Sequence, residues 1–172
     1  MHPTSFDNMG KLLNKYITSE YLKERTNPLL IDFGSAIAEE SGTESYKDLD
    51  IVSKFNYKGV DIIPGRNVDI VMEDPYTIPL ENNSVDVLIS GQAFEHIEFF
   101  WVSFLELVRV VKKDSYIILT APSAGYVHRH PVDCWRFFPD AMPALAKWGR
   151  VELIETFTLE DGWKDNFGVF KK

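Results

Sequence analysis

Residues 28–43 read PLLIDFGSAIAEESGT, an apolar run followed by a turn that opens on a glycine. The run at 29–33 predicts a strand buried on both faces, which is typical of a parallel sheet. Gly34 directly follows this strand, so the backbone can turn there and a ligand can approach without meeting a side chain. The stretch therefore predicts the first strand of an α/β fold, with a binding turn at its end.

Apolar runs and helical stripes alternate along the rest of the chain. Residues 93–114 carry one apolar stripe at helical spacing and predict a long amphipathic helix. Strands that alternate with helices predict a doubly wound α/β fold, in which ligands bind at the carboxyl ends of the strands. Further strands are expected at 59–63, 68–72, 85–90, 116–121, 151–158 and 166–170, and further helices at 9–24 and 139–147.

Length, charge and cysteine content bound the class of protein. A chain of 172 residues favours one domain, and we expect 1–172 to fold as a single unit. The net charge of −8 argues against a nucleic-acid backbone as the main partner. The single cysteine, Cys134, cannot form an intrachain disulfide, and the sequence shows neither a signal peptide nor an apolar span of about 18 residues. We expect a cytoplasmic protein that binds neither nucleic acid nor membrane.

Polar residues and glycines gather where the expected strands end. Asp61 ends the second strand, where a carboxylate can accept both hydroxyl hydrogens of a ribose. Asp74 follows the third strand and can accept a hydrogen bond from the exocyclic amine of a base. The first strand ends at 32–35 and the fourth at 90–92, each with a glycine that removes side-chain bulk. An aspartate at a strand end often only caps a turn, but the four ends together indicate a nucleoside-like ligand.

Two segments carry a resemblance to a known family: DPYTIPLENNSVDVLISGQAFEHI at 74–97 and LELVRVVKKDSYIILTAPS at 105–123. With them, the whole stretch 29–123 resembles class I S-adenosylmethionine-dependent methyltransferases, in particular the small methyltransferase-domain family called type 11. The resemblance implies a Rossmann-like, seven-stranded sheet, mostly parallel with an antiparallel last strand and with helices on both faces. It also implies S-adenosyl-L-methionine as the cofactor.

The resemblance implies a role for each matching residue. Asp61 would bind the ribose hydroxyls, and Asp74 would face the adenine amine. Residues 90–92 would line the methionine and sulfonium region, largely through backbone groups, and the N-terminal helical segment at 1–27 is expected to pack on the cofactor side. The expected cofactor-binding residues are Asp32, Gly34, Ser35, Asp61, Ile62, Asp74, Ser90, Gly91 and Gln92.

The chain departs from the family pattern in the turn after the first strand. Ala36 and Ala38 replace the later glycines of that motif, and Gly42 follows four residues after Ala38. We expect a loop from Gly34 to about Ser45 that is longer than usual, with the next helix beginning near Ser45. Alanine is small enough to admit the cofactor, provided that its φ is negative.

Methyl transfer to a weakly acidic hydroxyl needs a base, and two histidine-containing segments offer candidates. His96 is the best candidate, because an unperturbed imidazole titrates near neutral pH; a hydrogen bond to a loop at a helix start is its alternative role. Glu95 is a second candidate, or else a favourable charge at a helix N-terminus. His128 and Arg129, in the segment after the fifth strand, are the remaining catalytic candidates.

The segment after the fifth strand also contains residues that can bind anions or metals. Arg129 or Arg136 can clamp an anionic acceptor such as a phosphate or a carboxylate, unless Asp133 pairs with Arg136 in a surface loop. A metal is not expected, because the His-x-His pair at 128–130 with a single cysteine matches no structural zinc pattern.

The resemblance points to a small-molecule, sugar or glycan-type acceptor for the methyl group. His96 favours methylation at oxygen. The acceptor pocket is expected to be either open or completed by the partner subunit of a homodimer. An NAD(P)-dependent oxidoreductase would want Gly-x-Gly-x-x-Gly after the first strand, where this chain has GSAIAE. The other alternative is a non-catalytic cofactor-binding or scaffold protein descended from methyltransferases, with the altered turn as its main support.

Overall fold

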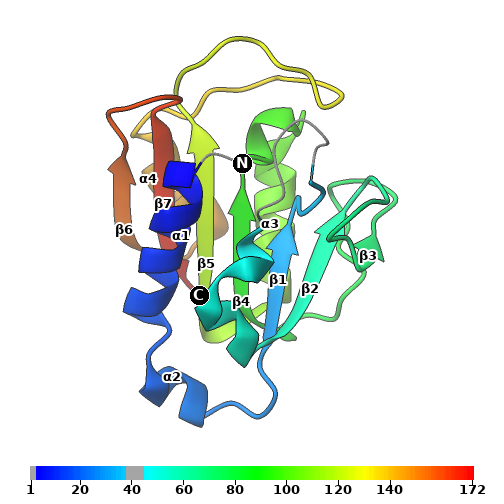
Figure 1. The fold of residues 1–172 in the computed structure, drawn as a ribbon, viewed down its shortest axis with the longest axis vertical. Coiled ribbons are helices and arrows are strands. Elements are labelled where there is room, and N and C mark those ends of the chain that lie inside the picture. Colours follow the sequence, from blue (N-terminus) through cyan, green and yellow to red (C-terminus); the bar gives the residue numbers. More distant parts are fainter. Residues whose placement is uncertain (1–2, 38–44) are drawn as a thin grey trace.

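The computed structural model describes residues 3–37 and 45–172, and within them seven strands form one sheet. The strands are β1 (Leu29–Phe33), β2 (Asn56–Asp61), β3 (Ile70–Val71), β4 (Val85–Gly91), β5 (Val111–Pro122), β6 (Glu152–Thr158) and β7 (Asp165–Lys171). They lie in the order β3-β2-β1-β4-β5-β7-β6 (Figure 1). Neighbours pair in parallel, except that β7 runs antiparallel to both β5 and β6. This topology confirms the predicted doubly wound, Rossmann-like fold.

Helices cover both faces of the sheet (Figure 1). They are the α-helices α1 (Pro3–Tyr16), α2 (Ser19–Lys23), α3 (Phe100–Val110) and α4 (Ala141–Gly149), and the 3-10 helices η2 (Tyr46–Asp48), η3 (Asp50–Lys54) and η4 (Phe94–His96). Successive residues of a strand point to opposite faces, so Leu30 packs in the apolar core with α1, η2 and η3, whereas Ile31 packs in the core with α3 and α4. Among the described residues, no helix has the length and apolar character that a membrane span requires.

The pattern at 9–24 gives two helices where one was predicted. The Thr18 hydroxyl accepts a hydrogen bond from Tyr21 N at 3.2 Å, which caps α2 as a separate helix. The chain therefore changes direction between α1 and α2, although its apolar spacing continues.

The prediction of one long helix at 93–114 is wrong in extent. Residues at its start form η4, and α3 covers only its central part. Val111 pairs with Val85 and already belongs to β5. Pairing with β4 thus overrides the helical spacing at the end of this segment. Burial and hydrogen bonding in the sheet stabilise these residues more than one further helical turn would.

The prediction that a helix begins near Ser45 is confirmed in position but not in type. Ser45 caps η2 reciprocally: its hydroxyl accepts from Lys47 N at 3.0 Å, and its own N–H donates to Asp48 Oδ2 at 2.9 Å. Two short 3-10 helices follow where an α-helix was expected. Ala38 and Gly42, on which the prediction of a longer loop depended, lie outside the described residues.

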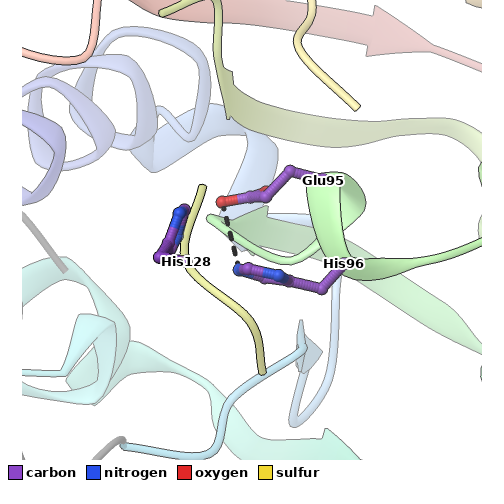
Figure 2. A group of neighbouring side chains, drawn as sticks. All are labelled: Glu95, His96 and His128. Atoms are coloured by element: carbon purple, nitrogen blue, oxygen red, sulfur yellow. Dashed lines mark ion pairs between the residues drawn. The ribbon is translucent and has the colours of Figure 1, made fainter. Parts of the chain in front are cut away.

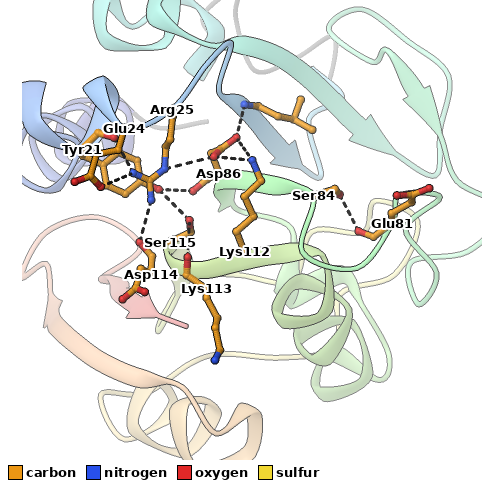
Figure 3. Close-up of polar contacts among 11 residues, drawn as sticks. Tyr21, Glu24, Arg25, Glu81, Ser84, Asp86, Lys112, Lys113, Asp114 and Ser115 are labelled. Atoms are coloured by element: carbon orange, nitrogen blue, oxygen red, sulfur yellow. Dashed lines mark hydrogen bonds and ion pairs between the residues drawn. The ribbon is translucent and has the colours of Figure 1, made fainter.

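A buried carboxylate holds the amino-terminal edge of the sheet (Figure 3). Asp86, near the start of β4, accepts hydrogen bonds from Leu29 N at 2.9 Å and from Lys112 Nζ at 2.8 and 2.9 Å. Arg25 Nε lies 3.4 Å from the same carboxylate, and the Tyr21 hydroxyl donates to the backbone oxygen of Asp86 at 2.6 Å. Asp86 therefore links β1, β4 and β5 to the segment around α2, at the edge opposite the carboxyl ends of the strands.

We expect Asp86→Ala to lower the free energy of unfolding by about 2–4 kcal/mol, because it leaves the partly buried Leu29 N–H and the Lys112 ammonium without their partner. Urea unfolding at neutral pH measures this change. Asp114→Asn is the control: Asp114 pairs with Lys171 but its side chain is 80% exposed, and asparagine tolerates its φ of 58°, so the loss of the charge should change the free energy by less than about 1 kcal/mol. Equal losses in the two variants would contradict the role given to Asp86.

Candidate active site

Asp61 ends β2 and ties together the turns that follow β1 and β2. Its Oδ2 accepts a hydrogen bond from Ala36 N at 2.9 Å, and its Oδ1 accepts one from Ile63 N at 3.2 Å. A carboxylate oxygen accepts more than one hydrogen bond, so both oxygens keep acceptor positions for hydroxyl donors. Asp61 thus lies at the edge of the sheet where a ribose-binding carboxylate is predicted, and its binding role stays a prediction.

Asp32 is buried, and its partner is another side chain of the sheet. The Tyr57 hydroxyl donates to Asp32 Oδ2 at 2.7 Å, and Asn67 Nδ2 donates to the Tyr57 hydroxyl at 2.8 Å. Burial raises the pKa of Asp32 to about 7; the Tyr57 hydrogen bond opposes this rise, and the charge of Asp61 adds to it. The predicted contact between Asp32 and the cofactor stays a prediction, but one of its oxygens already has a donor.

The two predicted binding glycines each face a protein side chain. Gly34 has a φ of +79°, which glycine adopts without strain, and a Cβ added there would overlap the Cβ of Ala93. A Cβ added at Gly91 would overlap the ring and hydroxyl of Tyr46, which is only 1% exposed. The Tyr46 hydroxyl lies 3.1 Å from Ser5 Oγ, so α1 packs over this end of the sheet as well. Small residues are therefore required at both positions by the fold itself.

Ser35 joins the turn after β1 to the loop between β2 and β3. Its hydroxyl donates to Asn67 O at 3.0 Å, and Asn67 Nδ2 donates back to Ser35 O at 3.1 Å. A surface hollow of about 290 Å³ lies beside this junction. Its described lining residues are Ile37, Ser45, Lys47, Asp48, Arg66 and Asn67.

The end of β4 combines a satisfied hydroxyl with an unsatisfied amide. Ser90 is fully buried, and its hydroxyl donates to Phe33 O at 2.8 Å. Gln92 has a φ of 57°, and its N–H donates to Thr120 O at 3.1 Å. The Nε2 of Gln92 is buried and has no hydrogen-bond partner in the part of the chain that the structure describes. A buried amide without an acceptor costs free energy, so Gln92 is suited to donate to a ligand.

The remaining two predicted cofactor residues lie further out. Asp74 is exposed, and its Oδ1 accepts a hydrogen bond from Tyr76 N at 2.8 Å, which is the turn cap that an aspartate at a strand end often makes. Its predicted contact with the adenine amine stays a prediction. Ile62 is 38% exposed directly after Asp61 and offers an apolar surface at the same edge.

Glu95, His96 and His128 come together beyond the ends of β4 and β5 (Figure 2). Glu95 and His96 belong to η4, whereas His128 belongs to the segment after β5. One ligand atom from each of the three side chains lies within 4.8 Å of the others. His96 Nδ1 lies 2.7 Å from Val132 O and therefore carries the proton, which leaves the lone pair on Nε2, 3.6 Å from Glu95 Oε1.

Backbone hydrogen bonds hold the segment after β5 against η4. Cys134 N and Trp135 N both donate to the backbone oxygen of Glu95, at 2.7 and 3.2 Å. The Trp135 indole N–H donates to Ile97 O at 3.0 Å. These contacts explain how His128, far along the chain, reaches Glu95 and His96.

Asp133 pairs with Arg136, as the alternative interpretation of this surface loop predicted. Arg136 donates to the two carboxylate oxygens at 2.6 and 2.8 Å, and the backbone N–H of His128 donates to Asp133 Oδ2 at 2.7 Å. Arg136 is therefore engaged within its own loop and is not available to clamp an acceptor. Arg129 is exposed and makes no hydrogen bond or ion pair with the residues that the structure describes.

Burial favours the uncharged forms of Glu95 and His96. It raises the pKa of Glu95 to about 8, so this carboxyl holds its proton at pH 7. Burial also lowers the pKa of His96, against the opposing effect of its hydrogen bond with Val132 O. A neutral imidazole with a free Nε2 lone pair can accept a proton from a neighbouring group.

A family model described as a methyltransferase domain matches residues 34–119, which is half of the chain. The chain belongs to the methyltransferase-domain family. The match includes the predicted cofactor residues from Gly34 to Gln92 and the Glu95–His96 pair. The prediction of an S-adenosylmethionine-dependent methyltransferase is confirmed at the level of the family. No curated protein matches the sequence.

Solved structures of methyltransferases share the fold of this methyltransferase. A SAM-dependent methyltransferase from Aquifex aeolicus superimposes with a TM-score of 0.58 at 15% identity, over 99% of this chain and 98% of that one. The 1,6-didemethyltoxoflavin-N1-methyltransferase of Burkholderia thailandensis gives 0.67 at 8% identity, with 98% and 84% covered. The geranyl diphosphate C-methyltransferase of Streptomyces coelicolor A3(2) gives 0.64 at 8% identity, with 96% and 78% covered. Both of the latter were crystallised with S-adenosylhomocysteine.

Sequence patterns did not single out several residues that shape the site of the methyltransferase. Tyr46, Tyr57 and Asn67 lie against the predicted binding residues Gly91, Asp32 and Ser35, yet none of them ends a strand or belongs to a recognised motif. The polar type of Asn67 between two apolar runs was a weak signal of a turn. The partners of Asp32 and Gly91 are set by packing between distant segments, which local spacing does not encode.

Asp32 predicts a pH dependence of stability. Its pKa is about 7 in the folded state and about 3.9 in an unfolded chain, so between these values the folded state binds more protons. This group therefore makes the free energy of unfolding fall as the pH rises from about 4 to about 7. Asp32→Asn removes that fall, while its amide oxygen can still accept from Tyr57. We expect urea unfolding between about pH 5 and pH 8 to show a shallower decline in the variant than in the wild type. Equal slopes would contradict the raised pKa.

Proposed function

We propose that this methyltransferase transfers the methyl group of S-adenosylmethionine to a hydroxyl oxygen of a small-molecule or glycan-type acceptor. The observation that carries the proposal is the position of the Glu95–His96–His128 cluster directly beyond the strand ends that hold the predicted cofactor residues. The cofactor supplies an activated methyl group, so the protein has to align donor and acceptor and exclude water.

The residues at the strand ends fit the cofactor. Asp61 keeps acceptor positions for two ribose hydroxyls, and Asp74 keeps one oxygen for the adenine amine. The buried and unpartnered Nε2 of Gln92 matches an acceptor group on the methionine portion. Asp32, Gly34, Ser35, Ile62, Ser90 and Gly91 complete the proposed binding edge.

His96 supports methyl transfer to oxygen. Because its Nδ1 donates to Val132 O, its Nε2 lone pair is the acceptor in the cluster that can take a hydroxyl proton. As the proton moves to Nε2, the hydroxyl oxygen forms a bond to the methyl carbon and the bond from that carbon to sulfur breaks. Glu95 and His128 would orient the hydroxyl, and the exposed Arg129 would contact an anionic group of the acceptor.

The acceptor class rests on charge and on the chemistry of the cluster. The net charge of −8 disfavours nucleic acid as the acceptor. Two methyltransferases of this fold are named for methylation at a nitrogen and at a carbon, so the fold alone does not choose the acceptor atom. The proton acceptor beside the strand ends is what favours oxygen.

One observation favours a second candidate, a non-catalytic protein of methyltransferase fold. The Tyr46 ring fills the space over Gly91, next to the proposed methionine end. A Tyr46 ring that stays there would leave no room for a ligand group beside Gly91. Titration with the cofactor separates the two candidates.

We expect S-adenosylhomocysteine to bind the wild type and Asp61→Asn to weaken this binding by about 10- to 100-fold, because a hydrogen bond to a charged acceptor is lost. Isothermal titration calorimetry measures both affinities. Asp50→Asn, an exposed carboxylate on η3, is the matched control and should bind like the wild type. A folded wild type that releases no heat would favour the non-catalytic candidate, and an unchanged affinity of Asp61→Asn would remove Asp61 from the site.

His96→Asn should lower kcat by about 10²- to 10⁴-fold, the usual contribution of a general base, without changing the affinity for S-adenosylhomocysteine. The assay follows transfer of a labelled methyl group to a panel of hydroxyl-containing small molecules and sugars. The exposed His130 supplies the control variant His130→Asn, which should turn over normally. Undiminished turnover by His96→Asn would refute its role, and products methylated at nitrogen or carbon would refute the choice of oxygen.

A further inference from the structure

We propose that Glu95, His96 and His128 form a binding site for one divalent transition-metal ion, with Zn²⁺ as the best match (Figure 2). Two histidines and one glutamate are a ligand set of catalytic zinc sites, which leave a further coordination position open. The same set is also used by iron sites, so the ligand chemistry points to this class of metals rather than to Mg²⁺ or Ca²⁺.

The distances suit a metal. Two ligands at about 2.0–2.1 Å from a tetrahedral ion lie about 3.3 Å apart. His96 Nε2 and Glu95 Oε1 are separated by 3.6 Å, and all three ligand atoms lie within 4.8 Å of one another. At 3.6 Å the first pair is too far apart for a direct hydrogen bond but close to the span of two ligands on one ion. Closing the widest separation from 4.8 Å to this span needs a shift of up to about 1.5 Å in the segment that carries His128.

Both histidines are oriented as metal ligands are. A metal-binding histidine donates its other ring N–H to a carbonyl or a carboxylate, which fixes the tautomer and the ring. His96 Nδ1 is 2.7 Å from Val132 O. His128 Nδ1 is 3.4 Å from its hydrogen-bond partner, the backbone oxygen of Tyr126, and 3.4 Å from the carboxylate of Asp133, which Arg136 holds in place. In each ring Nε2 is then the nitrogen that can coordinate.

The burial of Glu95 is the independent observation that points to a ligand. Glu95 is fully buried, and neither carboxyl oxygen has a hydrogen-bond partner in the described part of the chain. Buried carboxyl groups without partners are rare, because they lose their hydration and gain nothing in return. A cation between Glu95 and His96 would displace the carboxyl proton to solvent and coordinate one oxygen directly.

The site differs from the metal pattern that the sequence offers. His130 and Cys134 belong to the same segment as His128, but both are exposed and neither joins the group of three. Sequence spacing does not reveal this ligand set, because Glu95 and His96 are separated from His128 by more than thirty residues.

The role of the ion in the reaction rests on the proposed function, whereas metal binding itself does not. An acceptor hydroxyl at the open position would lose its proton to water, because a bound cation lowers its pKa. The resulting oxygen lone pair forms the bond to the methyl carbon, and sulfur leaves with the electrons of the broken carbon–sulfur bond. His96 holds the ion in this route, so solvent replaces it as the proton acceptor.

The test is a titration of chelator-treated full-length protein with ZnCl₂, in competition with a chromophoric chelator. We expect one equivalent to bind and His128→Ala to weaken the affinity by at least about 10-fold, which is the smallest loss seen even for outer-sphere changes. Glu95→Gln should do the same, and His128→Ala covers the case in which the buried Glu95 variant fails to fold. His130→Ala and Cys134→Ser are the controls and should bind like the wild type.

The outcomes that overturn the proposal are distinct. They are no saturable binding to the wild type, unchanged binding by His128→Ala, or loss of binding in His130→Ala. Co²⁺ gives a second reading, since visible d–d bands are expected without the thiolate charge-transfer band that Cys134 would produce. Calorimetry with S-adenosylhomocysteine keeps this test separate from the proposed function: zinc binding without cofactor binding would leave the metal site standing and refute the methyl transfer.

Discussion

In the centre of the sheet, β1 pairs in parallel with β2 on one side and with β4 on the other. Strands in parallel pairs end at the same edge, so Asp61 at the end of β2 and Gln92 after β4 lie at that edge on either side of β1, although they are far apart in the chain. The buried Asp86 holds the opposite edge, where it joins the first residue of β1 to β4 and β5. Asp86 thus stabilises one edge, and the opposite edge carries the proposed binding residues.

The segment between β5 and α4 adds a second layer to the binding edge. Its backbone N–H groups at Cys134 and Trp135 donate to Glu95 O, and the Asp133–Arg136 pair fixes its shape. His128 is carried on this segment to the side of Glu95 and His96. The proposed chemistry therefore depends on a loop held by backbone hydrogen bonds, while the cofactor residues depend on the strands themselves.

The strands could be predicted because strands buried on both faces appear in the sequence as short runs of apolar, often β-branched residues. The predicted residues at the strand ends follow from where these runs end. The sequence pattern overextended the helix at 93–114, since nothing local shows that Val111 pairs with Val85. Glu95, His96 and His128 could be predicted as candidates from their residue types, but the sequence does not show that their side chains meet. The contacts of Tyr46 with Gly91 and of Tyr57 with Asp32 could not be predicted from the sequence, because they form only when the sheet is packed.

The central claim is that the carboxyl edge of β1, β2 and β4 holds S-adenosylmethionine with its sulfur directed at the Glu95–His96–His128 cluster. A crystal structure of the complex with S-adenosylhomocysteine tests it most directly. The account predicts ribose hydroxyls on Asp61, an acceptor group of the ligand on Gln92 Nε2, and Tyr46 moved away from Gly91. A ligand bound elsewhere, or one whose sulfur faces away from the cluster, would contradict it.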